Sequence, residues 1–370
     1  MQTTAFDYYL PEELIAQKPA NPRDYSRLMV IDRKSGDIKH RRFYNLPEYL
    51  NAGDLLIFND TRVMKARLYG VRVPSGSKIE ILLLQRVEEG LWKVLVKPGR
   101  RMRTGDRFKI QKLDQFISGK IVKEFPDGSW LAKLSKEHLL ESLGSIPLPP
   151  YIKKAGNDPE RYQTVYSKIT GSIAAPTAGL HFTPNLIEYI KNIGVELAFT
   201  TLHVGWDSFR PMKSEDIKSH NMHSEYWEIG KEAATAINKA KYSKQKIISV
   251  GTTTVRLLEY AALHKQQSHD SYISEGSGWT DLFIYPGYEF KIIDGLITNF
   301  HLPQSTLLML TSAFAGKDLV MHAYSLAKKA KYNFYSFGDA MIIIWHHFLV
   351  KGYQLTHIQH EFRSFLIYIT

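Results

Sequence analysis

The stretch Gly171-Ser-Ile-Ala-Ala-Pro-Thr-Ala-Gly-Leu-His-Phe-Thr183 lies near the middle of the chain and consists mostly of small residues. Two glycines, three alanines and a proline give it too little side chain to pack as a core helix or strand, and it carries too little charge for a solvated linker. Because glycine tolerates close approach and left-handed turns, we expect another group to lie against this backbone. A tight structural turn that buries His181 would produce the same pattern.

Several signals for the start of a helix follow directly. Thr183 is suited to the N-cap, Pro184 to the first helical position, and Phe182 to a hydrophobic contact with Ile187. The small-residue stretch therefore leads into a helix N-terminus, with His181 just ahead of it.

Outside this stretch, strand-like and helix-like segments alternate, which is typical of a layered α/β sheet. We expect strands at residues 27–32, 54–58, 195–204, 246–250, 282–285 and 296–298 and near Tyr335, and helices at 6–14, 184–193, 231–241, from 252, 305–316 and 318–329. Polar motifs follow four of the strands, at 59–62, 203–209, 251–256 and 299–301. Ligands of such sheets bind at the carboxyl ends of the strands, so we expect these motifs to form a site.

A different pattern interrupts the α/β segments. Between residues 64 and 149, six short β-rich runs are separated by turn signals such as Pro74-Ser75-Gly76 and Pro126-Asp127-Gly128, which indicates a small inserted antiparallel β-barrel. The predicted domains are therefore a discontinuous α/β domain at 1–63 and 150–342, the barrel at 64–149, and an appended tail at 343–370.

One loop of the predicted barrel is rich in cations: Lys97, Arg100, Arg101, Arg103 and Arg107. Such a density suits phosphates, although a solvated loop would have the same composition.

The composition limits the possible function. The 370 residues include no cysteine, which excludes disulfides, cysteine zinc sites and thiol nucleophiles, and the net charge of +11 favours a polyanionic partner. No signal peptide or membrane-length apolar run is present, so we expect a cytoplasmic protein.

The motifs narrow the chemistry further. A strand, Gly251, the threonines 252–254 and a helix place backbone amides and hydroxyls where an anion or carboxylate could bind. The segment lacks the Walker lysine, no Gly-x-Gly-x-x-Gly or Gly-x-Ser-x-Gly motif is present, and His203, His220, His223 and Glu225 have no metal-ligand spacing. The residues alone thus indicate an α/β enzyme with a basic β insertion that acts on or near a nucleic acid, and no metal is expected.

Eight sequence blocks, in order, resemble the S-adenosylmethionine:tRNA ribosyltransferase-isomerases of queuosine biosynthesis. They are Phe58-Asn-Asp-Thr-Arg-Val63, 171–183, Leu202-His-Val-Gly205, Met222-His-Ser-Glu225, 250–256, Phe283-Ile-Tyr-Pro-Gly-Tyr288, Ile297-Thr-Asn-Phe-His-Leu-Pro303 and Gly338-Asp-Ala-Met341. The resemblance covers roughly residues 1–342. The chain departs from it at Trp206-Asp207-Ser208, which is bulkier than expected, and in the tail, which holds four histidines.

The resemblance implies an α/β domain interrupted by a β-barrel and a specific reaction. The ribosyl part of S-adenosylmethionine would be transferred to the 7-aminomethyl-7-deazaguanine at the tRNA wobble position and isomerised, giving epoxyqueuosine and releasing adenine and methionine. S-adenosylmethionine would be a consumed cosubstrate, no cofactor would be permanently bound, and we expect a monomer. A non-catalytic tRNA-binding protein and an S-adenosylmethionine-dependent tRNA methyltransferase remain alternatives.

With the family in view, roles can be assigned as hypotheses. Histidine exchanges protons near neutral pH, so the candidates for acid–base catalysis are led by His203 and His181 and followed by His223, Glu225 and Asp60. Each could instead be a structural hydrogen-bonding residue. The candidates for cosubstrate binding are Thr252, Thr253, Thr254, Arg256, Gly171, Ala174, Pro176 and Gly179. The candidates for RNA binding are Arg62, the five barrel-loop cations, and Tyr285 and Tyr288, which could stack on a base.

Overall fold

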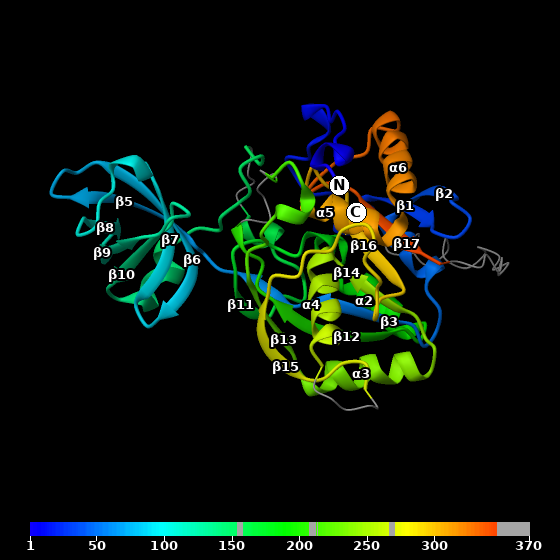
Figure 1. The fold of residues 1–370 in the computed structure, drawn as a ribbon. Coiled ribbons are helices and arrows are strands. Elements are labelled where there is room, and N and C mark those ends of the chain that lie inside the picture. Colours follow the sequence, from blue (N-terminus) through cyan, green and yellow to red (C-terminus); the bar gives the residue numbers. More distant parts are fainter. Residues whose placement is uncertain (154–157, 207–211, 213, 266–270, 346–370) are drawn as a thin grey trace, which may run out of the picture.

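The computed structural model describes residues 1–153, 158–206, 212, 214–265 and 271–345 (Figure 1). Its main element is a nine-stranded mixed sheet with the order β15-β13-β12-β3-β14-β16-β17-β1-β2. The strands are β1 (Arg27–Asp32), β2 (Ile38–Arg42), β3 (Leu55–Asn59), β12 (Glu196–Leu202), β13 (Glu225–Ile229), β14 (Ile247–Val250), β15 (Gly276–Thr280), β16 (Gly295–Asn299) and β17 (Ala340–Ile344).

The direction of the central strands determines where a site can form. β12, β3, β14 and β16 run parallel, so their carboxyl ends lie at one edge of the sheet. β17 runs antiparallel to β16 and pairs Ala340 with Asn299, which brings the start of β17 to that same edge. β1 runs parallel to β17 and pairs Leu28 with Ala340.

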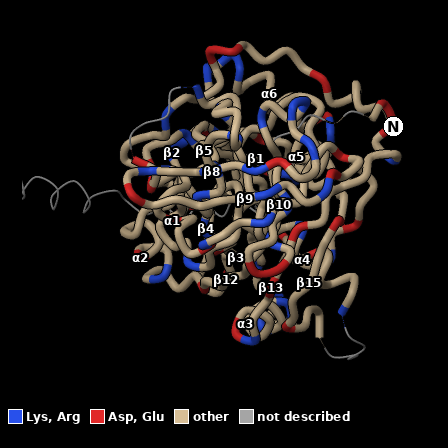
Figure 2. The backbone as a smooth tube through the Cα atoms, turned by 90° about the vertical axis from the view of Figure 1, so that its left-hand side faces the viewer, with Lys and Arg blue, Asp and Glu red and all other residues tan. Residues whose placement is uncertain are grey.

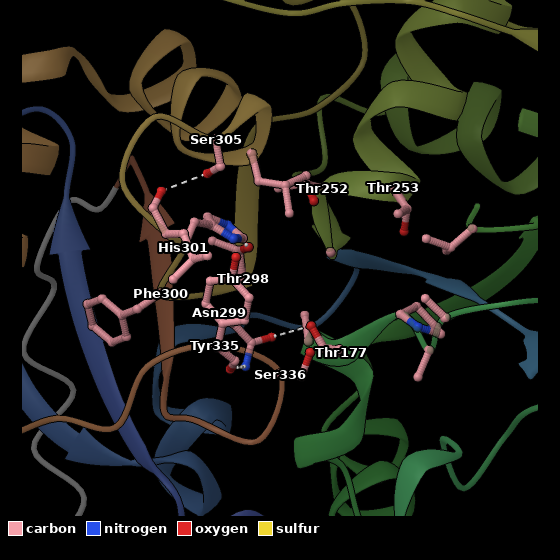
Figure 3. Close-up of a pocket in the computed structure, with 18 of the residues that line it drawn as sticks. Thr177, Thr252, Thr253, Thr298, Asn299, Phe300, His301, Ser305, Tyr335 and Ser336 are labelled. Carbon is pink, nitrogen blue, oxygen red and sulfur yellow. Dashed lines mark hydrogen bonds between the residues drawn. The ribbon is translucent and has the colours of Figure 1, made fainter. Parts of the chain in front are cut away.

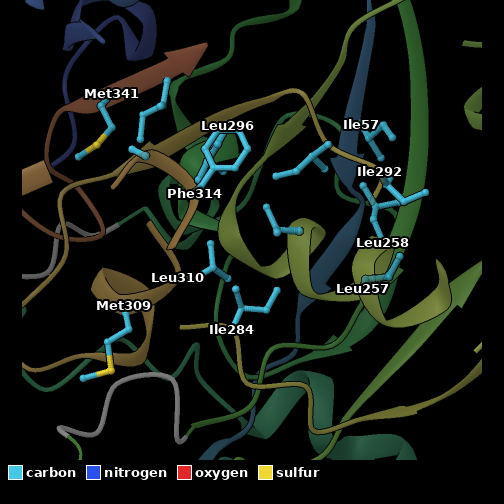
Figure 4. Packing of buried hydrophobic residues seen from close by; sticks show 14 of the residues in the cluster. Ile57, Leu257, Leu258, Ile284, Ile292, Leu296, Met309, Leu310, Phe314 and Met341 are labelled. Atoms are coloured by element: carbon cyan, nitrogen blue, oxygen red, sulfur yellow. The ribbon is translucent and has the colours of Figure 1, made fainter. Parts of the chain in front are cut away.

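Both faces of the sheet carry buried apolar residues. Leu55 and Ile57 of β3 point into a core shared with α3 (Lys231–Tyr242), α4 (Thr252–Leu263), α5 (Thr306–Ala315) and α6 (Lys317–Lys329), part of which Figure 4 shows. Leu56 and Phe58 point the other way and pack with α2 (Pro184–Asn192). This alternation is that of a strand covered on both sides.

The inserted segment forms a closed six-stranded barrel with the order β10-β7-β6-β5-β8-β9, beside the α/β domain in Figure 1. Its strands are β5 (Arg67–Val73), β6 (Lys78–Glu88), β7 (Leu91–Lys97), β8 (Arg107–Lys112), β9 (Gln115–Glu124) and β10 (Trp130–Leu134), followed by the short α1 (Leu140–Leu143). Two residues from outside the insertion reach its core, since Ile173 is part of it and Trp206 packs against it. A small parallel pair, β4 (Thr61–Val63) and β11 (Ile169–Ser172), lies where the chain passes between the domains.

The α/β class with an inserted antiparallel barrel is confirmed. All barrel strands fall within 64–149, whereas β17 takes in Ile343 and Ile344, which were assigned to the tail. Residues 346–370 lie outside the described part of the chain. No helix in that described part is long and apolar enough to cross a membrane.

Three predicted elements are wrong. Residues 282–285 form no strand, because the carbonyl of Leu282 accepts from Arg256 Nε at 2.9 Å and Ile284 anchors the segment in the core. The last strand begins at Ala340 and not near Tyr335. In place of one helix at 6–14 there are two 3₁₀ turns, Thr3–Phe6 and Glu12–Leu14, with Pro11 capping the second.

Candidate functional site

A pocket lies at the carboxyl edge of the central strands (Figure 3). Four segments supply most of it: the small-residue stretch, the start of α4, the end of β16 with the turn to α5, and the loop before β17, and Tyr151 and Val204 complete it. Its lining consists of Tyr151, Ala174, Ala175, Pro176, Thr177, Ala178, Val204, Gly251, Thr252, Thr253, Thr298, Asn299, Phe300, His301, Leu302, Pro303, Ser305, Leu307, Tyr335 and Ser336. Of the four motifs expected to form a site, those at the ends of β14 and β16 line this pocket, the one after β12 contributes Val204, and the one at 59–62 contributes no lining residue.

The N-terminus of α4 opens into this pocket. Gly251 caps the helix with φ of 95°, a left-handed conformation that glycine adopts without strain. Thr252 and Thr253 line the pocket beside the free amides of the first turn, which favour an anionic group. Thr254 points the other way, since its Oγ1 donates to the carbonyl of Val250 at 2.8 Å.

His181 does not line the pocket but supports it from behind. Its Nε2 accepts from Asn299 Nδ2 at 3.0 Å, so Nδ1 carries the proton and donates to Ser26 Oγ at 2.7 Å. Burial, reinforced by nearby Arg23, lowers the pKa of His181 to about 3. The imidazole is therefore neutral, and it fixes the amide of Asn299, whose Oδ1 accepts from Thr177 at 3.0 Å.

His301 is a second neutral histidine at the pocket, and it was not among the candidates. Its Nε2 lies 2.9 Å from Thr298 Oγ1, its backbone amide donates to Tyr324, and its carbonyl accepts from Tyr8. Burial lowers its pKa to about 3. The sequence placed 299–301 at a strand end, and that position was the signal by which Asn299 and His301 could have been ranked as site residues.

His203 lies at the end of another strand, β12, at the same edge of the sheet. It follows β12 directly, next to Val204 of the pocket wall, and its Nδ1 is 2.8 Å from Thr61 Oγ1. Its ring stacks on Tyr226 at a centroid distance of 5.7 Å. Burial lowers the pKa of His203, and the carboxylate of Glu228 acts against this.

Asp60 directly precedes Thr61, the hydrogen-bonding partner of His203. Its Oδ1 accepts from Thr201 Oγ1 at 2.7 Å, and burial together with Glu228 raises its pKa. Arg62 is turned away, since it donates to Ser167 at 3.0 Å and to Glu160 at 2.5 Å. Of these three candidates, Asp60 and His203 thus lie at the end of the sheet, and Arg62 is engaged in a salt bridge with Glu160.

Glu225 and Arg256 form a buried ion pair, with each side chain 6% exposed. Arg256 Nε also donates to the carbonyl of Leu282, and Glu225 Oε1 accepts from the backbone amide of Gly205 at 2.8 Å. Neither lines the pocket, so the pair fixes the turn after β12 and the segment after β15. His223 is exposed ahead of β13. The described residues contain no group of three His, Cys, Asp or Glu side chains that could hold a metal ion.

The glycines of the small-residue stretch are required by neighbouring side chains. A Cβ on Gly171 would lie 2.5 Å from His203 Nε2, and one on Gly179 would lie 1.9 Å from the hydroxyl of Tyr166. The expected close approach is therefore made within the protein at these two positions. Ala174 and Pro176, in contrast, line the pocket itself.

The candidates for RNA binding fall into two groups, tyrosines that pack within the protein and cations that are exposed. Tyr288 donates to Glu259 at 3.3 Å and packs edge-on against Phe290, and Tyr285 is half-buried beside Phe283. The cations of the barrel loop are all exposed, and within the described residues none of their side chains forms a salt bridge, whereas the backbone amide of Arg103 donates to Asp106 at 2.8 Å. These cations are Lys97, Arg100, Arg101, Arg103 and Arg107. Figure 2 looks onto this side of the molecule and shows basic segments across the barrel strands.

The fold and the pocket define an α/β protein with a pocket at the carboxyl edge of its sheet and an inserted barrel that carries a basic loop. The chain belongs to the queuosine biosynthesis protein family, whose model matches residues 3–343. Relatives from Halothermothrix orenii, Clostridium kluyveri and Staphylococcus aureus are named S-adenosylmethionine:tRNA ribosyltransferase-isomerase. They are 53%, 52% and 50% identical, and each match covers 93% of this chain and 100% of the relative.

A solved structure is similar as well. The crystal structure of the S-adenosylmethionine tRNA ribosyltransferase from Thermotoga maritima matches with a TM-score of 0.54 and 41% identity. The match covers 92% of this chain and 100% of that protein. The family resemblance expected from the eight blocks is thereby confirmed.

Proposed function

We propose that this chain is an S-adenosylmethionine:tRNA ribosyltransferase-isomerase. It moves the ribosyl part of S-adenosylmethionine onto the 7-aminomethyl-7-deazaguanine at the tRNA wobble position and isomerises it to epoxyqueuosine, with release of adenine and methionine. The observation that carries the proposal is the identity of about half of all residues to relatives of this name along their full length. The pocket supports it, because most of its lining residues lie in the sequence blocks that carry the family resemblance.

The pocket offers suitable groups for the cosubstrate. The carboxylate of its methionine part would bind the threonine hydroxyls and free amides at the start of α4. Arg256 was a candidate for this role, but its pairing with Glu225 leaves the role to Thr252 and Thr253. The small residues at 174–178 leave room for the nucleoside, and Asn299, whose Nδ2 is held by His181 and the carbonyl of Tyr335, can accept a further hydrogen bond through Oδ1.

The reaction requires proton transfers at two positions. The sulfonium acidifies the neighbouring C5′ hydrogens, so a base must remove one of them, and departing adenine needs a proton. His203 suits the base, because Thr61 Oγ1 can donate to the carbonyl of Ile169 and accept from Nδ1, which leaves a lone pair on Nε2. Asp60, whose pKa is raised by burial, suits the acid. His181 has both nitrogens engaged and serves as a positioning residue.

Product analysis tests this proposal. Purified protein is incubated with tRNA that carries the aminomethyl precursor and with S-adenosylmethionine labelled in its ribose and methyl groups. We expect the ribose label in tRNA and free adenine and methionine, and we expect the same products with a chelator present. Methyl transfer with S-adenosylhomocysteine would identify a methyltransferase, and binding without any product would identify a non-catalytic tRNA-binding protein. We further propose that the protein acts as a cytoplasmic monomer without a bound cofactor.

A further inference from the structure

One face of the large sheet is left open at its β15 end. Trp227 points to the covered side, where it packs beside Tyr260 of α4. Tyr226 and Glu228, on either side of Trp227 in β13, point to the opposite face. On that face Glu228 is exposed, Trp279 of β15 is 48% exposed and Phe199 of β12 is 39% exposed. In Figure 1, β13 and β15 form the lower edge of the α/β domain on the barrel side.

Three aromatic rings line up across this open face. The amide of His203 donates to the carbonyl of Tyr226 at 2.9 Å, and Tyr226 is the register partner of Trp279. His203 stacks on Tyr226, and Trp279 meets Tyr226 edge-on at 5.7 Å. We call His203, Tyr226 and Trp279 the aromatic ladder. Aromatic residues exposed on an open sheet are a recurrent platform for unpaired RNA bases.

Charged groups border the aromatic ladder. Glu228 pairs in register with Thr201, one row along the same face, and Thr201 donates to Asp60. Tyr226 donates to Glu228 at 3.4 Å. Exposed Lys168 is adjacent, since its amide donates to the carbonyl of Asp60 at 2.7 Å. The face thus presents the carboxylate of Glu228 for a cation and a lysine for a phosphate.

The ladder is continuous with the pocket. His203 heads the ladder, and the next residue, Val204, lines the pocket at the end of β12. A base stacked at this end of the ladder would lie beside the cosubstrate. A mixed aromatic and acidic face suits an unpaired base with a positively charged substituent better than it suits a double-stranded RNA backbone.

We propose that this open face binds the target nucleotide of the tRNA anticodon loop, with the base stacked on the aromatic ladder and its aminomethyl ammonium beside Glu228. The inference rests on the proposed function and adds the surface that recognises the base. It replaces Tyr285 and Tyr288, which are engaged elsewhere, as the stacking residues.

Binding of an anticodon stem-loop, measured by fluorescence anisotropy, tests the stacking. We expect Trp279→Ala to weaken binding about tenfold and Trp279→Phe to retain most of it. Tyr189→Ala, which removes a 50% exposed tyrosine from α2, is the matched control and should bind like wild type. Affinity for S-adenosylmethionine and the melting temperature should stay unchanged in all three variants. Wild-type affinity in Trp279→Ala would overturn the proposal.

A pair of hairpins tests the acidic contacts. One carries 7-aminomethyl-7-deazaguanine at the wobble position and the other carries guanine. We expect wild type to prefer the first several-fold, and Glu228→Gln to reduce that preference while leaving affinity for the guanine hairpin unchanged. Equal preference in Glu228→Gln and wild type would contradict this part.

Two further outcomes are distinguishable. If wild type sediments as a dimer that Trp279→Ala dissociates, the face binds a second copy and the proposal fails. If wild type releases no adenine while Trp279→Ala still loses hairpin affinity, the proposed function fails and the RNA surface stands.

Discussion

At the scale of single residues, the structure separates two histidines that look alike in the sequence. His181 is buried, hydrogen-bonded through both nitrogens and stacked on Phe43 at 5.0 Å. His203 is half-buried and has one nitrogen with a single hydroxyl partner. A tight turn that buries His181 was one of the two explanations of the sequence pattern, and it holds for this residue. No local pattern could decide this, because the partners Ser26 and Asn299 are more than a hundred residues away.

The buried state of His181 makes stability depend on pH. Its pKa falls from 6.5 in the unfolded chain to about 3, so between these values only the unfolded state binds the proton. Stability is therefore full above the unfolded pKa and is lost as the pH falls, by up to about 1.4 kcal/mol per pH unit for each such histidine. We expect His181→Gln to show a shallower loss than wild type in urea unfolding between about pH 7 and about pH 5. Parallel pH profiles would contradict the assigned state. Nitrogen chemical shifts of wild type, which should report a neutral Nδ1–H tautomer at about pH 5, check it without a variant.

Gly171 is the residue that allows His203 its position. A methyl group there would lie 2.5 Å from Nε2 and displace the ring. If His203 is the base, we expect Gly171→Ala to lower the single-turnover rate by about a hundredfold, with binding of S-adenosylmethionine nearly intact. Gly230→Ala is the control, since a Cβ there has no neighbour within 4 Å. A Gly171→Ala enzyme as fast as the control would remove His203 from the proton transfer, and His203→Ala tests the same role directly.

At the scale of elements, the predictable parts are those whose signals are local. Thr183 caps α2 by accepting from the amide of Leu186 at 3.2 Å, and Ser305 caps α5 in the same way at 3.2 Å. The barrel strands were found from their turns, because Gly and Pro mark turns by their own backbone preferences. β13 and β15 were missed: β15 reads Gly-Ser-Gly-Trp-Thr, which has little strand propensity and is held by pairing with β13. The strand predicted at 282–285 was wrong for the opposite reason. This segment is apolar because Ile284 is buried in the core, and it pairs with no strand in the described part of the chain.

The Glu225–Arg256 pair ties three elements together, and we expect it to behave as a buried ion pair. Either Glu225→Gln or Arg256→Met leaves one buried charge without its partner, which costs about 3–5 kcal/mol of unfolding free energy. The double variant should be less destabilised than the sum of the two single variants. Urea unfolding of the four proteins measures this. Additive losses would show that the two side chains act independently, and a loss of S-adenosylmethionine affinity at unchanged stability would return Arg256 to the pocket.

At the scale of the whole molecule, the small-residue stretch joins the parts. Ile173 packs in the barrel core, and Ala174 packs in the core beneath α4. Ala175 packs in a small core with Tyr162, and Ala178 packs in the core beneath α2. Small side chains are needed where four packed bodies meet at one pocket. The sequence identified this stretch by composition, yet the segments it meets, such as 298–305 and 335–336, come together only in the fold.

The barrel provides the last test, because it separates tRNA affinity from cosubstrate binding. Arg100, Arg101 and Arg103 are exposed cations on an insertion whose core lies apart from the pocket. A long polyanion can reach such a loop, and each phosphate contact lowers the logarithm of affinity by somewhat less than one unit per decade of salt. Replacing the three arginines with glutamine should therefore weaken tRNA binding and flatten the salt slope by roughly two to three units, with cosubstrate affinity unchanged. The charge-matched control replaces Lys191, Lys231 and Lys329, which are exposed on the α/β domain, and should alter the slope little. An unchanged slope in the arginine variant would identify a solvated loop and assign the tRNA contacts to the α/β domain.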